Sequence, residues 1–191
     1  MKIIVGLGNP GMFYRGPRHN VGFLVLDQLS RTYHIPLSER RFRALYGTGQ
    51  IATHPVVLAK PLGYMNRSGE AVKRIVGLFR AAVEDVIVIH DDLDLSFGRL
   101  RFKRRGGDGG HQGVRSMIEA LGGNQFARLK VGIGRPPRGM DPADYVLMPF
   151  EAEEEPHLET VFSRAADALG TMLSEGIEKA MDRVHLLTPP S

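Results

Sequence analysis

The sequence predicts an α/β protein built as a single three-layer αβα domain, residues 1–191, around a twisted, mixed and mostly parallel central sheet. Short apolar runs rich in β-branched residues alternate along the chain with longer segments whose apolar residues recur every three to four positions. Such alternation is typical of strands linked by crossover helices. The length and the 42% content of apolar residues suffice for one domain with a substantial core, and no repeat or linker divides it.

The first half of the chain predicts three strands and two helices. The opening run Ile3, Ile4 and Val5 is typical of a buried strand, and the helices follow from apolar residues at helical spacing. A Thr-His-Pro turn at residues 53–55 separates two of the strands. In chain order we expect a strand at 3–7, a helix at 21–33, strands at 45–52 and 56–60, and a helix at 71–79.

The second half continues the alternation. A continuous β-branched run after residue 85 predicts a central strand, and Leu100 and Phe102 alternate with basic residues as in a strand with one buried face. We expect strands at 86–90, 99–103 and 129–133, a helix at 114–121, and helix from 156 to about 187.

Composition excludes several classes of protein. The chain has no cysteine, which excludes disulfides, thiolate metal sites and a cysteine nucleophile and suits a reducing, cytoplasmic location. No apolar stretch approaches the roughly 20 residues that span a bilayer, and no signal peptide is recognisable. Because no large apolar surface patch is indicated, we expect a monomer without a stable protein partner. We also expect the protein to act without a membrane, a metal or a cofactor.

Positive charge is concentrated in one part of the chain. Between Leu95 and Met140 lie ten basic residues and two acidic ones, a net charge of +8, although the whole chain carries only +4. A one-sided basic surface is what a polyanionic partner such as RNA requires, whereas a solvated surface without a partner is the plainer alternative.

The segment GLGNPG at residues 6–11 fits the G-x-G-x-x-G pattern of dinucleotide-binding proteins. In those proteins the last glycine opens a helix. Here Gly16 and Pro17 disfavour a helix before His19, and Asp27, the expected acidic partner, lies inside a helical run. The pattern therefore favours a sharp turn after the first strand that brings polar residues to one cleft, and we expect no nucleotide.

Polar side chains follow several predicted strands, where the loops of an open α/β sheet converge. Histidine with a carboxylate partner can activate water for hydrolysis without a covalent step. On residue type alone His19, His90 and His111 are equal candidates for the base. Three carboxylates, Asp91, Asp92 and Asp94, also allow a Mg²⁺ site as an alternative.

Five motifs, taken in order, resemble the bacterial peptidyl-tRNA hydrolase family. They span almost the whole chain and are GLGNPGxxYxxxRHNxG (6–22), KPxxYMNxSG (60–69), HDDLDxxxGxxRxK (90–103), GGxGGHxG (106–113) and KVGIGRP (130–136). The resemblance implies hydrolysis of the ester that joins a peptide to tRNA, with tRNA as partner and the basic strand on its phosphates.

The resemblance also implies roles for individual residues. His19 is expected to be the proton acceptor, Asp91 to stabilise its basic form, and Asn9 to distinguish blocked from unblocked aminoacyl-tRNA. The remaining matches imply contacts with the tRNA or the peptide by Tyr14, Tyr64, Asn66, His111, Gln112, Lys103 and Lys130.

Two positions depart from the family pattern. Pro17 replaces a usual threonine, and Gln112 replaces a usual asparagine, so that its amide lies one methylene further out. An RNA-binding protein of the same fold with lost or secondary activity is the alternative function. A peptidyl-tRNA hydrolysis assay separates the two.

Overall fold

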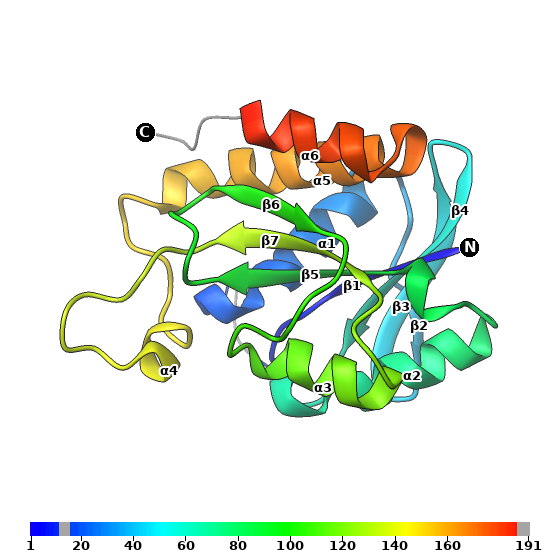
Figure 1. Cartoon of the computed structure of the whole chain (residues 1–191), viewed down its shortest axis with the longest axis horizontal. Coiled ribbons are helices and arrows are strands. Elements are labelled where there is room, and N and C mark those ends of the chain that lie inside the picture. The colour runs from blue at the N-terminus through cyan, green and yellow to red at the C-terminus, as the bar shows by residue number, and fades with distance from the viewer. Residues whose placement is uncertain (12–15, 187–191) are drawn as a thin grey trace.

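The structure is a computed structural model that describes residues 1–11 and 16–186. Its centre is a seven-stranded sheet in the order β2-β3-β4-β1-β5-β7-β6 (Figure 1). The four central strands β4, β1, β5 and β7 are parallel, while β2, β3 and β6 make antiparallel pairs toward the two edges. The strands are β1 (Lys2–Gly6), β2 (Glu39–Arg41), β3 (Ala44–Ile51), β4 (His54–Pro61), β5 (Val86–Asp92), β6 (Leu100–Lys103) and β7 (Ala127–Gly132).

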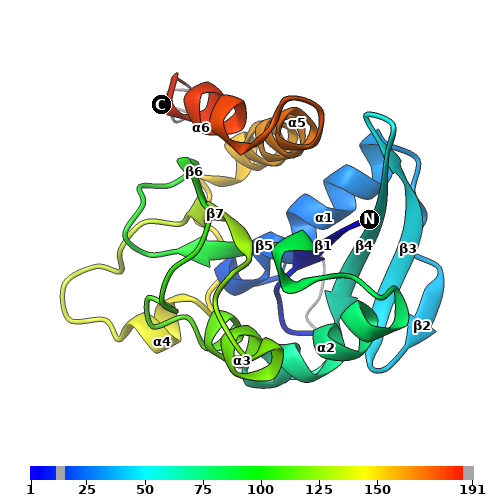
Figure 2. The same cartoon turned by 45° about the vertical axis from the view of Figure 1, so that its right-hand side comes forward.

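Helices cover both faces of the sheet, which confirms the predicted fold class (Figures 1 and 2). One apolar core lies between the sheet and α1, α5 and α6, and a second lies between the sheet and α2 and α3. The helices are α1 (Val21–Thr32), α2 (Ser68–Leu78), α3 (Gln112–Leu121), α4 (Pro142–Tyr145), α5 (Leu158–Glu175) and α6 (Ile177–Leu186). Single 3-10 turns occur at Arg18–Asn20, Met65–Arg67, Val83–Asp85 and Glu155–His157.

The glycines of the opening motif let α1 lie directly on the sheet. A Cβ on Gly6 would come within 2.2 Å of the carbonyl oxygen of Gly22, and a Cβ on Gly22 within 2.4 Å of that of Ile89. A Cβ on Gly8 would meet the ring of Phe23 at 2.7 Å. Because β1 and α1 cross almost in backbone contact, these positions need glycine for packing. Helix α1 begins at Val21, after His19, as the sequence predicts.

Four details differ from the sequence prediction. The sequence gives no sign of β2, whose three residues are all exposed and charged, nor of α4, which has only four residues. The hairpin between β3 and β4 turns at Ala52 and Thr53, both with positive φ, so His54 and Pro55 already belong to β4. The C-terminal helical segment is broken at Gly176, whose φ is 93°. Within residues 1–11 and 16–186 no helix is both long and apolar enough to cross a bilayer.

Candidate active site

A cleft of about 800 Å³ lies at the carboxyl ends of the parallel strands. Loops that follow β1, β4 and β5 supply one side, and the loop before α3 and the segment around α4 supply the other. Most of the sequence-predicted site residues line this cleft, namely Asn9, His19, Tyr64, Asn66, Asp91, His111, Gln112 and Lys130.

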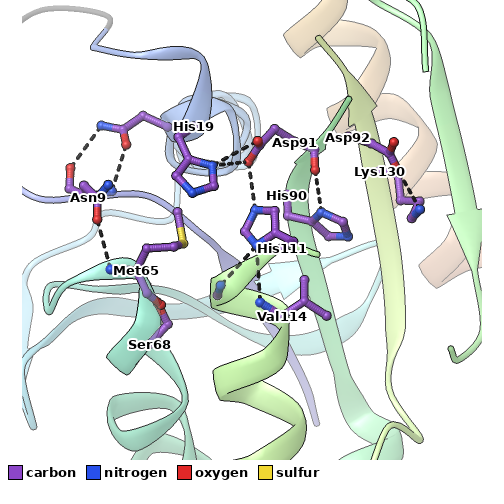
Figure 3. A network of polar contacts seen from close by, with 12 residues as sticks. Asn9, His19, Met65, Ser68, His90, Asp91, Asp92, His111, Val114 and Lys130 are labelled. Carbon is purple, nitrogen blue, oxygen red and sulfur yellow. Dashed lines mark hydrogen bonds and ion pairs between the residues drawn. The ribbon is translucent and has the colours of Figure 1, made fainter. Parts of the chain in front are cut away.

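His19 and Asp91 form a buried pair at the base of the cleft (Figure 3). The Nδ1 atom of His19 lies 2.9 Å from both carboxylate oxygens of Asp91, although 72 residues separate the two in sequence. Asp91 is 4% exposed. A proton on Nδ1 that is donated to this carboxylate leaves the lone pair of the ring on Nε2, which is the arrangement a general base needs.

His111 donates to the same carboxylate from the other side. Its Nε2 lies 2.9 Å from Oδ1 of Asp91, while its Nδ1 accepts hydrogen bonds from the main-chain N–H groups of Gly113 and Val114 at the start of α3. Because Nδ1 accepts, the proton is on Nε2 and the ring is neutral. His111 thus caps α3 and anchors it to Asp91.

Asp91 stays ionised despite its burial. Burial acts to raise the pKa of Asp91, but the neighbouring rings of His111 and His19, which donate hydrogen bonds to the carboxylate, outweigh it and hold the pKa well below its usual range. The carboxylate therefore carries a full negative charge beside His19, where it stabilises a proton taken up by that ring.

His90 plays a different part from the other two histidines. It is 2% exposed, its Nδ1 donates to the main-chain oxygen of Asp91 at 2.7 Å, and its ring packs edge-on against His111. Burial, and after it the neighbouring His111, lowers the pKa of His90 to about 3. Within the described part of the chain, the Nε2 of His90 is buried without a hydrogen-bond partner. A neutral ring held in this way is unsuited to proton transfer with substrate, so the structure favours His19 over His90 as the base.

Hydrogen bonds hold both the main chain and the side-chain oxygen of Asn9. Its main chain exchanges two hydrogen bonds with the side chain of Asn20, at 2.8 and 3.0 Å, and its Oδ1 accepts from the N–H of Met65 at 2.9 Å. These contacts fix the amide orientation, and among residues 1–11 and 16–186 the Nδ2 group has no hydrogen-bond partner, which makes it available as a donor in the cleft. Asn20 in this role was not predicted, although it follows His19 directly.

The cleft wall formed by residues 141–147 is held in place by Arg18, which is 1% exposed. Its guanidinium pairs with Glu154 at 2.7 Å and lies 4.5 Å from the ring centroid of Tyr145. The main-chain N–H of His19 donates to the carbonyl of Val146 at 2.8 Å. The wall and the catalytic histidine are therefore positioned by the same 3-10 turn. Nothing in the sequence pattern indicated this buried ion pair.

The acidic cluster does not converge on one point. Asp91 faces the two histidines, Asp92 pairs with Lys130, and Asp94 pairs with Arg135. Each carboxylate thus faces different partners, which disfavours the alternative of a Mg²⁺ site. The possible metal-ligand atoms of His19, Asp91 and His111 lie within 4.8 Å of one another, but both histidines are hydrogen-bonded to the carboxylate of Asp91.

The remaining predicted residues are spread around the cleft. Tyr64, Asn66 and Gln112 are exposed on its rim, and Lys103 lies on β6 outside its lining. Tyr14 lies outside the described residues.

Arg128, one of the ten basic residues between Leu95 and Met140, was wrongly counted toward the basic surface. It is 1% exposed, and its guanidinium donates hydrogen bonds to the carbonyl groups of Gly106 and Gly107. These hydrogen bonds hold in place the loop that carries His111.

An α/β sheet with a buried histidine–carboxylate pair at the ends of its parallel strands defines a protein with a general-base type of active site. The chain belongs to the peptidyl-tRNA hydrolase family, whose model matches residues 3–190. This confirms the resemblance seen in the sequence motifs. The family is one of hydrolytic enzymes, so the prediction of an enzyme of this class is also confirmed.

Individual relatives agree over almost the full length. The chain is 51% identical to a peptidyl-tRNA hydrolase of Exiguobacterium sibiricum, covering 97% of this chain and 100% of the relative. It is 44% identical to that of Bacillus subtilis, with 97% and 98% covered. A crystal structure of peptidyl-tRNA hydrolase from Acinetobacter baumannii is similar with a TM-score of 0.91 and 35% identity, covering 100% of this chain and 97% of that one.

Proposed function

We propose that this protein hydrolyses the ester bond between a peptide and tRNA, with His19 as general base. The observation that carries the proposal is the contact of His19 Nδ1 with both oxygens of an ionised, buried Asp91. Asp91 holds the ring with its Nε2 lone pair available to a water in the cleft. Membership in the peptidyl-tRNA hydrolase family supports this substrate.

The chemical step needs no covalent enzyme intermediate. His19 Nε2 takes a proton from water while the oxygen of that water attacks the ester carbonyl, and Asp91 stabilises the imidazolium that results. The tetrahedral intermediate then expels the ribose oxygen of the tRNA, which takes the proton back from His19. The peptide leaves as a carboxylic acid and the tRNA as a free hydroxyl.

Asn9 provides a physical basis for selecting blocked substrates. Its Nδ2 donates a hydrogen bond. In an N-blocked substrate, the group attached to the α-nitrogen of the esterified residue has a carbonyl oxygen that accepts this bond. An unblocked aminoacyl group presents an ammonium at this place, which has hydrogens of its own and cannot accept. The same amide therefore binds one substrate and rejects the other.

The tRNA is proposed to lie along β6. Arg101 and Lys103 alternate outward on this edge strand, and both are exposed. Such side chains hold phosphates without reading sequence, which suits an enzyme that accepts many tRNAs. Lys130 is paired with Asp92, so its contact with RNA is weaker than its position in the motif suggests. Asn66 and Gln112, on the cleft rim, are proposed to bind the 3′ end or the peptide.

The test is the His19→Ala variant, assayed with N-acetyl-aminoacyl-tRNA. We expect turnover to fall by about 10³-fold or more, within the range of general-base contributions. Binding of tRNA, measured by titration, should change less than threefold, since β6 is untouched. Unchanged turnover in a clean preparation would show that another group is the base. A protein that only binds RNA would show no turnover before the substitution either.

A further inference from the structure

A second cavity, of about 350 Å³, lies beside the active-site cleft. It is formed between the tip of the hairpin β2–β3 and the start of α2, which pack side by side (Figure 2). In the order of the sheet, this edge is opposite to β6. We call it the arginine groove, defined by Phe42, Arg43, Gly63, Arg67, Glu70 and Arg74.

The charges of the arginine groove are only partly balanced. Arg67 donates to Glu70 at 3.3 Å. Among residues 1–11 and 16–186, Arg43 and Arg74 have no ion-pair partner. Arg40, Arg41 and Lys73 add exposed positive charge nearby. A cavity with two uncompensated guanidinium groups fits an anion with two coplanar oxygens, because the guanidinium fork matches that geometry.

The groove wall is held in an unusual backbone conformation. Phe42 and Arg43 at the hairpin tip have φ values of 55° and 56°, a region that residues with side chains rarely adopt. The guanidinium groups of Arg41 and Arg74 lie 4.7 and 5.8 Å from the centroid of the Phe42 ring, which also packs against the apolar core. The ring thus serves to position guanidinium groups and is not an open surface for stacking a base.

One short loop forms a wall of both cavities. The main-chain N–H of Leu62 donates to the carbonyl of Arg43 at 2.7 Å, which ties the loop to the hairpin tip. Gly63 and Arg67 face the arginine groove, whereas residues 64–66 between them line the active-site cleft. The N–H of Met65 in this loop also fixes Asn9. A substrate peptide that extends from Asn9 along this loop therefore reaches the arginine groove.

We propose that the arginine groove binds the carboxylate of an acidic side chain in the peptide part of the substrate, upstream of the ester. The inference rests on the proposed function, in which Asn9 binds the first acyl carbonyl and the tRNA lies at the opposite edge along β6. Because the two arms of the substrate leave the ester in different directions, the groove meets the peptide. Peptides with a suitably placed Glu or Asp are bound more tightly than their amide counterparts.

The experiment compares peptidyl-tRNAs that carry one Glu or one Gln at successive positions two to five residues from the ester. With the wild-type protein, KM for Glu is expected to be about three- to tenfold lower than for Gln at the best position. Arg43→Gln and Arg74→Gln should each reduce this ratio, and the double variant should abolish it. Arg74→Lys, which keeps the charge but not the fork, should retain part of it. The matched control is Arg31→Gln on α1, an exposed arginine on the other face of the sheet.

Two results would overturn the proposal. One is that the wild-type protein has the same KM for the Glu and the Gln substrate at every peptide position. This comparison does not depend on whether any variant folds. The other is a loss of binding in the double variant that is as large for N-acetyl-aminoacyl-tRNA as for the Glu-containing peptidyl-tRNA. Since N-acetyl-aminoacyl-tRNA has no peptide arm, that result would mean that the groove binds RNA. Failure of the proposed function is distinct, since the wild-type protein would then not hydrolyse N-acetyl-aminoacyl-tRNA.

Discussion

Replacing Asp91 with Asn tests how the carboxylate controls His19. The substitution keeps size and shape, but it turns one oxygen acceptor into an N–H donor. Oδ1 of Asp91 receives both His19 and His111, while Oδ2 receives His19 alone, so the new amide nitrogen fits best at Oδ2. It then faces Nδ1 of His19. The ring can accept this hydrogen only by moving its own proton to Nε2, which removes the lone pair that the reaction needs.

The magnitude follows from the contacts that the charge supports. Hydrogen bonds to an ionised partner contribute roughly 1.5–3 kcal/mol each, and Asp91 accepts one from each of two histidines. Only the bond from His19 strengthens when that ring becomes protonated in the transition state, so loss of the charge raises the barrier by about 1.5–3 kcal/mol. At about 1.4 kcal/mol per factor of ten, this corresponds to a loss of roughly one to two orders of magnitude in kcat.

Single-turnover hydrolysis of N-acetyl-aminoacyl-tRNA measures this loss without interference from product release. Asp167→Asn, the same chemical change at an exposed position on α5, is the matched control and should leave the rate unchanged. A thermal melt of both variants separates a catalytic loss from unfolding. If Asp91→Asn kept a third or more of the wild-type rate, the charge of Asp91 would not be the support of His19.

Two further predictions concern stability. The pKa of His90, about 3 when folded against about 6.5 when unfolded, means that the unfolded chain binds the proton more tightly. Stability is then present above pH 6.5 and is lost as the pH falls toward 3, by about 3 kcal/mol between pH 7 and 4 in denaturant titrations. His90→Asn should lessen this loss, and an equal loss in the variant would contradict the assignment. Gly22→Ala places a Cβ 2.4 Å from the carbonyl oxygen of Ile89 and should lower the free energy of unfolding by roughly 1–3 kcal/mol or more. The control Gly77→Ala on α2, where an added Cβ meets no atom within 4 Å, should not lower it. Equal stability of the two variants would rule out the close contact of α1 with the sheet.

Most of the architecture could be predicted from the sequence because its strands and helices are strongly patterned. The central parallel strands are continuous apolar runs, and the long helices have clear apolar faces. β2 and α4 escaped prediction because three exposed charged residues and a single helical turn carry no periodicity. Their places are set by pairing with β3 and by packing against Arg18, which are tertiary effects.

The site was predictable only in part. The polar residues at the strand ends followed from the general behaviour of open α/β sheets, but the choice of His19 over His90 and His111 came from family resemblance. The reason lies in tertiary contacts: His90 is adjacent to Asp91 in sequence yet bonds only to its main chain, whereas His19 and His111 reach its carboxylate from other segments. Arg128 has the residue type of an RNA contact, and only its burial shows that it supports a loop.

In the proposed mechanism, His19, Asp91 and Asn9 together form a site that hydrolyses blocked esters of tRNA. The decisive measurement compares the rates at which the wild-type protein and Asn9→Asp hydrolyse N-acetyl-aminoacyl-tRNA and the corresponding unblocked aminoacyl-tRNA. The wild-type protein should prefer the blocked ester strongly. Asn9→Asp, which replaces the Nδ2 donor with an acceptor, should lose most of that preference by losing activity on the blocked ester. Equal hydrolysis of both esters by the wild-type protein would contradict this mechanism.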